Sequence, residues 1–124
     1  MFEENIITEK IIGCALTVHK TLGPGLLESA YKECLYYELT QSRIRVEKEK
    51  PMALIYKGIR MDCGYRLDLL VEDRVIVEIK AVEAINDVHL AQVITYLKLA
   101  ECRLGLLINF NVKLLKDRLK RVIL

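Results

Sequence analysis

The chain has 124 residues and a formal net charge of +2, and apolar residues make up 52% of it. This length predicts one domain over residues 1–124, and the charge is too small to favour nucleic-acid binding by net charge alone. The apolar share indicates either an unusually aliphatic core or a subunit interface, and we expect a homo-oligomer, most simply a homodimer.

The composition also argues against zinc, secretion and a membrane span. The four cysteines are widely spaced and form no CxxC pair, whereas zinc sites usually contain closely spaced ligands, so no zinc is expected. The acidic start of the chain lacks the basic segment of a signal peptide, and charges interrupt every apolar run. We therefore expect a cytoplasmic protein with reduced thiols and no membrane partner.

The first third of the chain predicts two helices. Apolar residues recur at three- and four-residue spacing over residues 7–22, which is typical of an amphipathic helix. Gly23-Pro24-Gly25 ends this helix, because proline cannot occupy a helix interior and the glycines permit a tight turn. A second helix is predicted over residues 26–40.

The middle of the chain changes to the two-residue period of strands. Residues 43–50 alternate in polarity, Pro51 interrupts them, and residues 53–56 form another short run. Two further strands are predicted at residues 65–71 and 75–81, on either side of a three-residue turn.

The last part predicts a helix, a buried strand and a final helix. Residues 85–100 are helical in pattern, and residues 104–110 form a nearly continuous apolar run typical of a buried strand. Residues 112–123 predict a basic amphipathic helix. The order of elements favours an α/β fold of the α+β kind, with a central mixed sheet flanked by helices.

The predicted hairpin contains the charged residues that suggest a chemical function. Two apolar triplets mark one of its faces: Leu67, Leu69 and Val71 on the first strand, and Val75, Val77 and Ile79 on the second. Both triplets lie on the same side only when the paired residue numbers add to an even total, because a one-residue slip moves every side chain to the other face. The shortest turn that satisfies this condition pairs Val71 with Val75. In that register Asp68 lies opposite Glu78, and Arg66 lies opposite Lys80.

Two carboxylates that face each other across a sheet repel, so they need a cation. Oxygen-only ligands favour Mg²⁺ or Mn²⁺ over zinc. Lys80 projects to the same face as Glu78, where it would orient or deprotonate a water, or stabilise charge on a phosphate. The alternative is a surface hairpin in which Lys80 and Arg66 simply neutralise Asp68 and Glu78.

Several motifs resemble known nucleases. Asp68, followed about ten residues later by Glu78-Ile79-Lys80 and then a helix, resembles the PD-(D/E)xK nuclease superfamily. Gly25-Leu-Leu-Glu-Ser-Ala-Tyr31 resembles the signature of the GxxExxY proteins, a compact branch of it. Leu67 stands where the superfamily's leading proline is usual. The likeness covers nearly the whole chain and implies a restriction-endonuclease-like core.

The resemblance implies a role for each matching residue. Glu28, Asp68, Glu78 and the backbone carbonyl of Ile79 would hold Mg²⁺ or Mn²⁺, and Lys80 would be the catalytic lysine. Gln92 and Tyr96 match a Q-x-x-x-Y motif that supports the site or touches nucleic acid. The implied activity is metal-dependent hydrolysis of phosphodiester bonds, with DNA as the expected partner. The alternatives are a nucleic-acid-binding or assembly module that keeps the fold without cleaving, and a purely structural oligomer.

Further residues are expected to contact nucleic acid or support the site. They are His89, Tyr31, Arg66, Lys113, Lys116 and Lys120. The basic residues would give salt-sensitive affinity that does not depend on sequence, although an ordinary solvated helix face explains the last three equally well. His89 lies three residues before Gln92 on one helical face, where a surface histidine is the plainer interpretation.

Overall fold

The computed structural model describes residues 2–124, and all of their side chains except those of residues 2 and 117. It contains three α-helices, one 3-10 helix and five strands in the described part of the chain. Their bounds are α1 (Phe2–Leu22), α2 (Glu28–Gln41), β1 (Val46–Tyr56), β2 (Ile59–Val71), β3 (Val75–Lys80), α3 (Asp87–Ala100), β4 (Leu104–Asn109), η1 (Leu115–Asp117) and β5 (Leu119–Ile123). None of these helices is long and apolar enough to cross a membrane.

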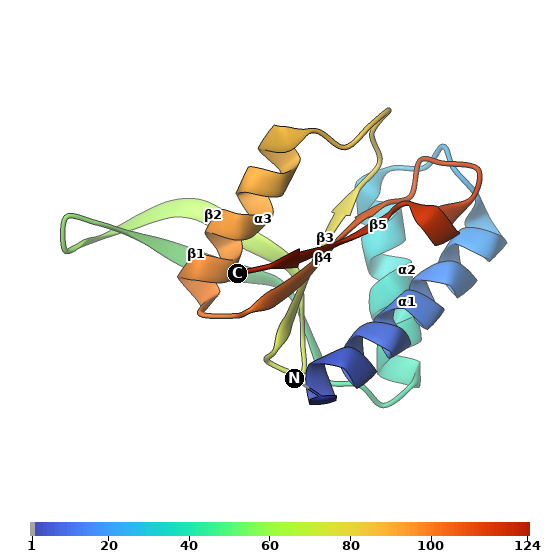
Figure 1. The fold of residues 1–124 in the computed structure, drawn as a ribbon, viewed down its shortest axis with the longest axis horizontal. Helices are drawn as coiled ribbons and strands as arrows, with labels where there is room; N and C mark the ends of the chain where they lie inside the picture. The colour runs from blue at the N-terminus through green and yellow to red at the C-terminus, as the bar shows by residue number, and fades with distance from the viewer. Residues whose placement is uncertain (1) are drawn as a thin grey trace.

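The strands form one mixed sheet in the order β1-β2-β3-β4-β5. β3 and β4 are parallel and are joined through α3, while all other neighbours are antiparallel. Helix α3 covers one face of the sheet, and α1 and α2 lie on the other (Figure 1). This confirms the predicted α/β class, a central mixed sheet flanked by helices.

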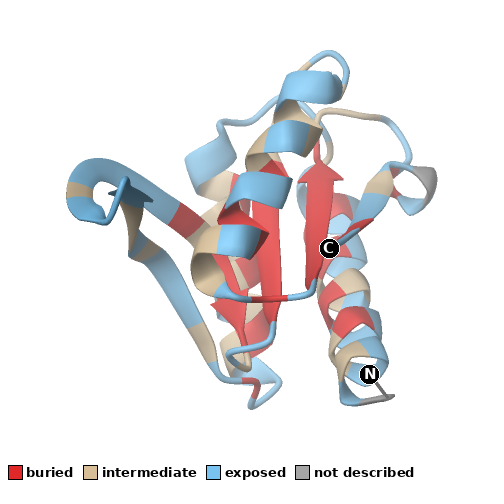
Figure 2. Cartoon of the chain, turned by 60° about the vertical axis from the view of Figure 1, so that its left-hand side comes forward, coloured by how far each residue is buried: buried red, intermediate tan, exposed pale blue. Residues whose placement is uncertain are grey.

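Each face of the sheet has its own apolar core. Leu69, Val77 and Ile79 pack among side chains of α1 and α2, while Leu70 and Ile76 pack under α3. The central strands are therefore almost wholly buried (Figure 2). Helix α3 lies so close to β4 that a methyl group added at Gly105 would be 3.0 Å from Val93 Cγ1. Both faces of β3 are thus fixed by packing, and β3 carries Glu78 and Lys80.

The predicted C-terminal helix over residues 112–123 is wrong. Only one short turn, η1, forms there, and Leu119–Ile123 is strand β5, which pairs with β4. The physical reason is the open edge of β4, whose backbone N–H and C=O groups need partners that a helix cannot supply. Residues 112–123 have apolar residues three and four apart, but over only twelve positions this spacing does not distinguish a helix from a turn followed by a strand.

The two short strands predicted around Pro51 are one strand, β1. β1 is at the edge of the sheet, where a proline that donates no hydrogen bond is tolerated. β2 is longer than predicted and begins at Ile59. The outer halves of β1 and β2 form a two-stranded projection, which we call the arm (residues 52–65; Figure 1).

One predicted face assignment is also wrong. Leu67 does not join Leu69 and Val71 but packs in the core under α3. The reason is that the β2–β3 pairing ends at Leu69–Val77, so the alternation set by that pairing no longer applies at Leu67. The predicted register is confirmed from Val71–Val75 to Leu69–Val77. The predicted position of Arg66 opposite Lys80 is wrong, because the β2–β3 pairing has ended there and Arg66 pairs with Pro51 of β1.

Candidate active site

Asp68 and Glu78 lie where β2 separates from β3. Beyond the Leu69–Val77 pair, the backbone N–H of Asp68 donates to Glu78 Oε2 at 2.9 Å. The backbone N–H of Ile79 donates to Asp68 Oδ2 at 2.8 Å. Each carboxylate thus accepts a hydrogen bond from the backbone of the opposite strand. These reciprocal bonds hold the two acids side by side.

Burial makes this acid pair electrostatically unfavourable. Glu78 is only 3% exposed, and this burial, with the nearby charge of Asp68, raises the pKa of the Glu78 carboxyl to about 8. Burial also raises the pKa of Asp68, although the Ile79 N–H and the charges of Lys32 and Lys80 oppose the shift. Both acids would therefore be stabilised by a proton or by a bound cation.

Lys80 is held by side chains of α3, the helix that covers one face of the sheet. Its Nζ donates to Gln92 Oε1 at 2.9 Å, and Gln92 Nε2 donates to the Tyr96 hydroxyl at 3.4 Å. The Tyr96 ring in turn packs edge-on against Tyr65, with 6.1 Å between the ring centroids. A chain of side-chain contacts therefore runs from the lysine beside the acids to the base of the arm.

Glu28 approaches the same region from the other face of the sheet. It is the first residue of α2, and its Oε2 accepts a hydrogen bond from the backbone N–H of Ala81 at 3.3 Å, just beyond β3. Its charge is close enough to raise the pKa of Asp68. The helix start and the end of β3 are thereby tied together, which places a third carboxylate near the pair.

Tyr31 is buried and positions the start of α2. Its hydroxyl donates to the Gly23 carbonyl at 2.6 Å and accepts from the Leu26 N–H at 3.1 Å. Its ring stacks on Phe110 with a centroid distance of 4.6 Å. Because the side chain is fully buried, it supports the turn before Glu28 and does not offer a surface to nucleic acid.

Lys32 is a site residue that the sequence reasoning missed. Its Nζ is 3.8 Å from Asp68 Oδ1 and 3.5 Å from Glu49 Oε2, and its side chain is only 17% exposed. The available signal was its position four residues after Glu28, which puts both on one face of α2. The lysine supplies part of the positive charge that the acid pair needs.

Comparison with known proteins identifies the family of this chain. Residues 5–122 match the family model described as the PD-(D/E)XK nuclease superfamily. The chain belongs to this superfamily. No curated protein and no solved structure gives a significant match.

PD-(D/E)XK nucleases generally use divalent metal ions, and the residues present fit one in their chemistry. The acids are oxygen donors, Glu78 is buried and Asp68 is half-buried, and the pKa values of both are raised, so a cation would relieve an existing cost. The described residues nevertheless contain no group of three or more His, Cys, Asp or Glu side chains arranged to hold a metal ion.

The other residues expected to contact nucleic acid or support the site are scattered over this PD-(D/E)XK chain. His89 caps α3, where its Nδ1 accepts from the Asn86 N–H at 3.1 Å, and Arg66 is exposed at the base of the arm. Lys113 and Lys116 line a hollow beside α1, whereas Lys120 lines another of about 470 Å³ near Asn109, which pairs with Lys80. Of the three lysines, only Lys120 borders an element of the candidate site.

Proposed function

We propose that this protein is a metal-dependent nuclease of the GxxExxY branch, acting as a single domain on phosphodiester bonds of nucleic acid, most simply DNA. The observation that carries the proposal is the pair formed by the buried Glu78 and the half-buried Asp68, with Lys80 two residues after Glu78 on β3. A buried acid pair costs stability, so its presence at a strand separation is better explained by a ligand than by packing.

In this proposal Asp68, Glu78 and the carbonyl of Ile79 hold Mg²⁺ or Mn²⁺, and Glu28 completes the set. A bound divalent ion would polarise the phosphate and lower the pKa of the attacking water. The backbone N–H groups of Asp68 and Ile79 fix one oxygen of each acid. The second oxygen of each acid is then the one that would bind an ion, and that of Asp68, Oδ1, lies 3.8 Å from Lys32 Nζ.

Lys80 acts on the reacting phosphate or its attacking water. Gln92 accepts one hydrogen bond from the ammonium group and so restrains it, leaving the other ammonium protons for a substrate. Tyr96 holds the amide of Gln92 in the orientation that accepts from Lys80. Gln92 and Tyr96 are therefore positioning residues in this mechanism.

The test is a cleavage assay on single-stranded and duplex DNA and RNA with Mg²⁺ and Mn²⁺. Lys80→Ala is expected to reduce the rate about 10²- to 10³-fold, as for loss of a charge-stabilising group. The same variant should keep its stabilisation by metal, because the carboxylates remain. Cleavage that is unchanged by Lys80→Ala and by Asp68→Ala would show that the activity comes from a contaminant.

A second candidate is a nucleic-acid-binding or assembly module without turnover. The specific observation that favours it is that the described residues form no complete three-ligand metal group. Under this candidate the protein binds nucleic acid equally well in EDTA and in Mg²⁺ and cleaves nothing. A homodimer is proposed under either candidate, and sedimentation at tens of micromolar tests it.

A further inference from the structure

The arm is an exposed structure that the proposed chemistry does not use. It projects beyond the sheet and both helical layers, and most of its residues are exposed (Figures 1 and 2). Four large apolar side chains there are 39–59% exposed: Ile55, Tyr56, Ile59 and Tyr65. A two-stranded hairpin is only marginally stable in water by itself. An arm that also exposes aromatic rings is therefore a surface for a partner.

The register of the arm places Tyr56 and Ile59 on one face of its tip. Residues directly opposite in an antiparallel pair share a face, and positions alternate along each strand. Tyr56–Ile59 and Leu54–Met61 are such pairs and share one face, whereas Ile55 lies opposite Arg60 on the other face. The register shifts between Leu54 and Met52, and Met52 pairs with Tyr65 at the base of the arm. There Tyr65 contacts Tyr96 of α3, which bonds Gln92, the partner of Lys80.

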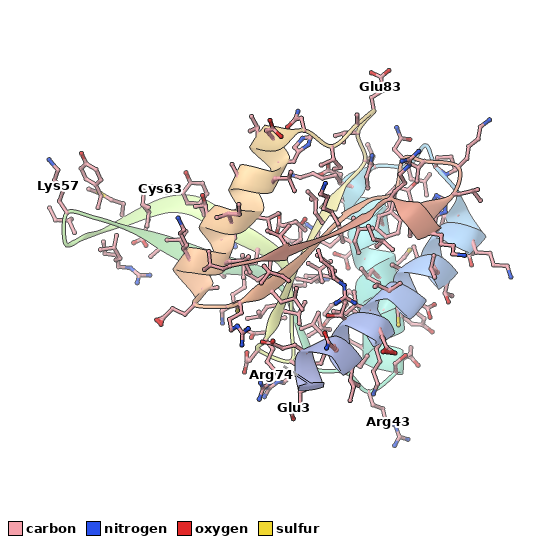
Figure 3. All side chains as sticks on the ribbon, in the orientation of Figure 1. Glu3, Arg43, Lys57, Cys63, Arg74 and Glu83 are labelled. Atoms are coloured by element: carbon pink, nitrogen blue, oxygen red, sulfur yellow. The ribbon has the colours of Figure 1, made fainter. Side chains whose placement is uncertain are left out.

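The charge of the arm selects the kind of partner. The arm contains the basic Lys57 and Arg60 and the acidic Asp62, a local excess of +1, and Arg60 pairs with Asp62. Lys50 and Arg66 at the base of the arm bring the local excess to +3. Lys57 is at the tip, pointing away from the body (Figure 3), and its Nζ is 5.5 Å from the Tyr56 ring centroid. A basic excess beside exposed rings complements a polyanion with flat groups, and it opposes two arms lying together.

We infer that the arm binds an unpaired stretch of nucleic acid and leads it to the candidate site. Bases stack on Tyr56 and Tyr65, and Lys57 and Arg66 contact phosphates. Aromatic rings on a basic surface are suited to single strands, because bases are free to stack only when unpaired. Arg66 is two residues before Asp68, so a nucleic-acid strand bound along the arm would lead toward Asp68 and Glu78. Binding by the arm does not depend on the proposed function, and only the delivery of the strand to a cleavage site rests on it.

The experiment measures binding in EDTA, where no metal-dependent cleavage occurs. A labelled 20-nucleotide single strand and the matching duplex are titrated by fluorescence anisotropy. The arm variant is Tyr56→Ala with Lys57→Glu, and the control is Tyr37→Ala with Lys10→Glu. The control loses an equally exposed ring (59% against 55%) and makes the same charge change on α1 and α2. Circular dichroism and the melting temperature check that both variants are folded.

The arm variant is expected to bind the single strand at least tenfold more weakly, and the control within about twofold of wild type. The slope of log K against log salt should also fall by about 0.7 in the arm variant only, for one lost phosphate contact. Equal weakening by both variants would overturn the inference in favour of net charge. Equal weakening on duplex and single strand would overturn the assignment to unpaired bases.

Two further outcomes separate this inference from the nuclease proposal. Arm-dependent binding without cleavage in Mg²⁺ or Mn²⁺ supports the arm and removes the nuclease. Cleavage with unchanged binding in the arm variant supports the nuclease and overturns the arm. Sedimentation tests whether the arm instead contacts a second copy of the chain. The inference is wrong if the wild type is a dimer, the arm variant is a monomer, and both bind nucleic acid equally well.

Discussion

Replacing Glu78 by glutamine tests whether the candidate site holds unfavourable charge. Glu78 is 3% exposed beside Asp68, and burial with that neighbouring charge raises its pKa to about 8. Glutamine has nearly the same shape, and its Oε1 still accepts the hydrogen bond from the Asp68 N–H. The variant therefore removes the ionisable group while it keeps the packing and the bond between the strands.

The sign and size of the effect come from linkage between proton binding and folding. The Glu78 carboxyl titrates near its ordinary value of 4.5 in the unfolded chain and near 8 in the folded protein, so between these values the folded state binds the extra proton. Wild-type stability then falls as the pH rises through this window and levels off above it. At about 1.36 kcal/mol per pKa unit, the loss is on the order of 4 to 5 kcal/mol. Glu78→Gln lacks this loss.

The assay is urea unfolding in EDTA at pH 5 and pH 9, followed by far-ultraviolet circular dichroism. Relative to wild type, Glu78→Gln should gain several kcal/mol at pH 9 and about 1 kcal/mol or less at pH 5. Glu83→Gln is the control, because Glu83 is exposed in the loop after β3 and points away from the body (Figure 3). If wild type and Glu78→Gln lose equal stability between the two pH values, the account of the buried pair is wrong.

Three further predictions concern the same region. Mg²⁺ or Mn²⁺ at about 100 times its dissociation constant should stabilise wild type by roughly 2.7 kcal/mol in a thermal-shift measurement, and Asp68→Ala should abolish the shift; an equal shift in both would place the ion elsewhere. Lys32→Met removes a cation beside Asp68 and should lower the free energy of unfolding at pH 7 by about 1 kcal/mol in urea; an increase would show that the lysine is not paired with the acid. Tyr31→Phe removes two hydrogen bonds to the turn before α2 and should cost about 1 to 3 kcal/mol in the same assay; a neutral result would mean that water replaces the hydroxyl.

The hairpin was predictable because burial fixes the parity of a strand. Apolar residues on both strands allowed only registers that put Asp68 and Glu78 on the same face, and the shortest of these registers, with Val71 opposite Val75, is the one observed. Helices α1, α2 and α3 were likewise visible as three- and four-residue periods. These signals are local, so they can be recognised in a single sequence.

The parts that could not be predicted depend on contacts distant in sequence. Strand β5 forms because β4 has an open edge, which the spacing of residues 112–123 does not reveal. The bond from Ile79 N–H to Asp68 exists because the ladder stops at Leu69, and no pattern in the hairpin marks that stop. Lys32 reaches Asp68 across the gap between α2 and β2, so only the packed layers make it a site residue.

The separation of β2 from β3 explains why the acids and the arm occur together. Where the strands part, the backbone N–H groups of Asp68 and Ile79 lose their ladder partners, and a buried N–H needs an acceptor. The two carboxylates supply it, which anchors them at the separation. β3 continues alongside β4, while β2 leaves with β1 as the arm. A single departure from regular pairing thus creates both the anchored acids and the exposed ribbon beside them.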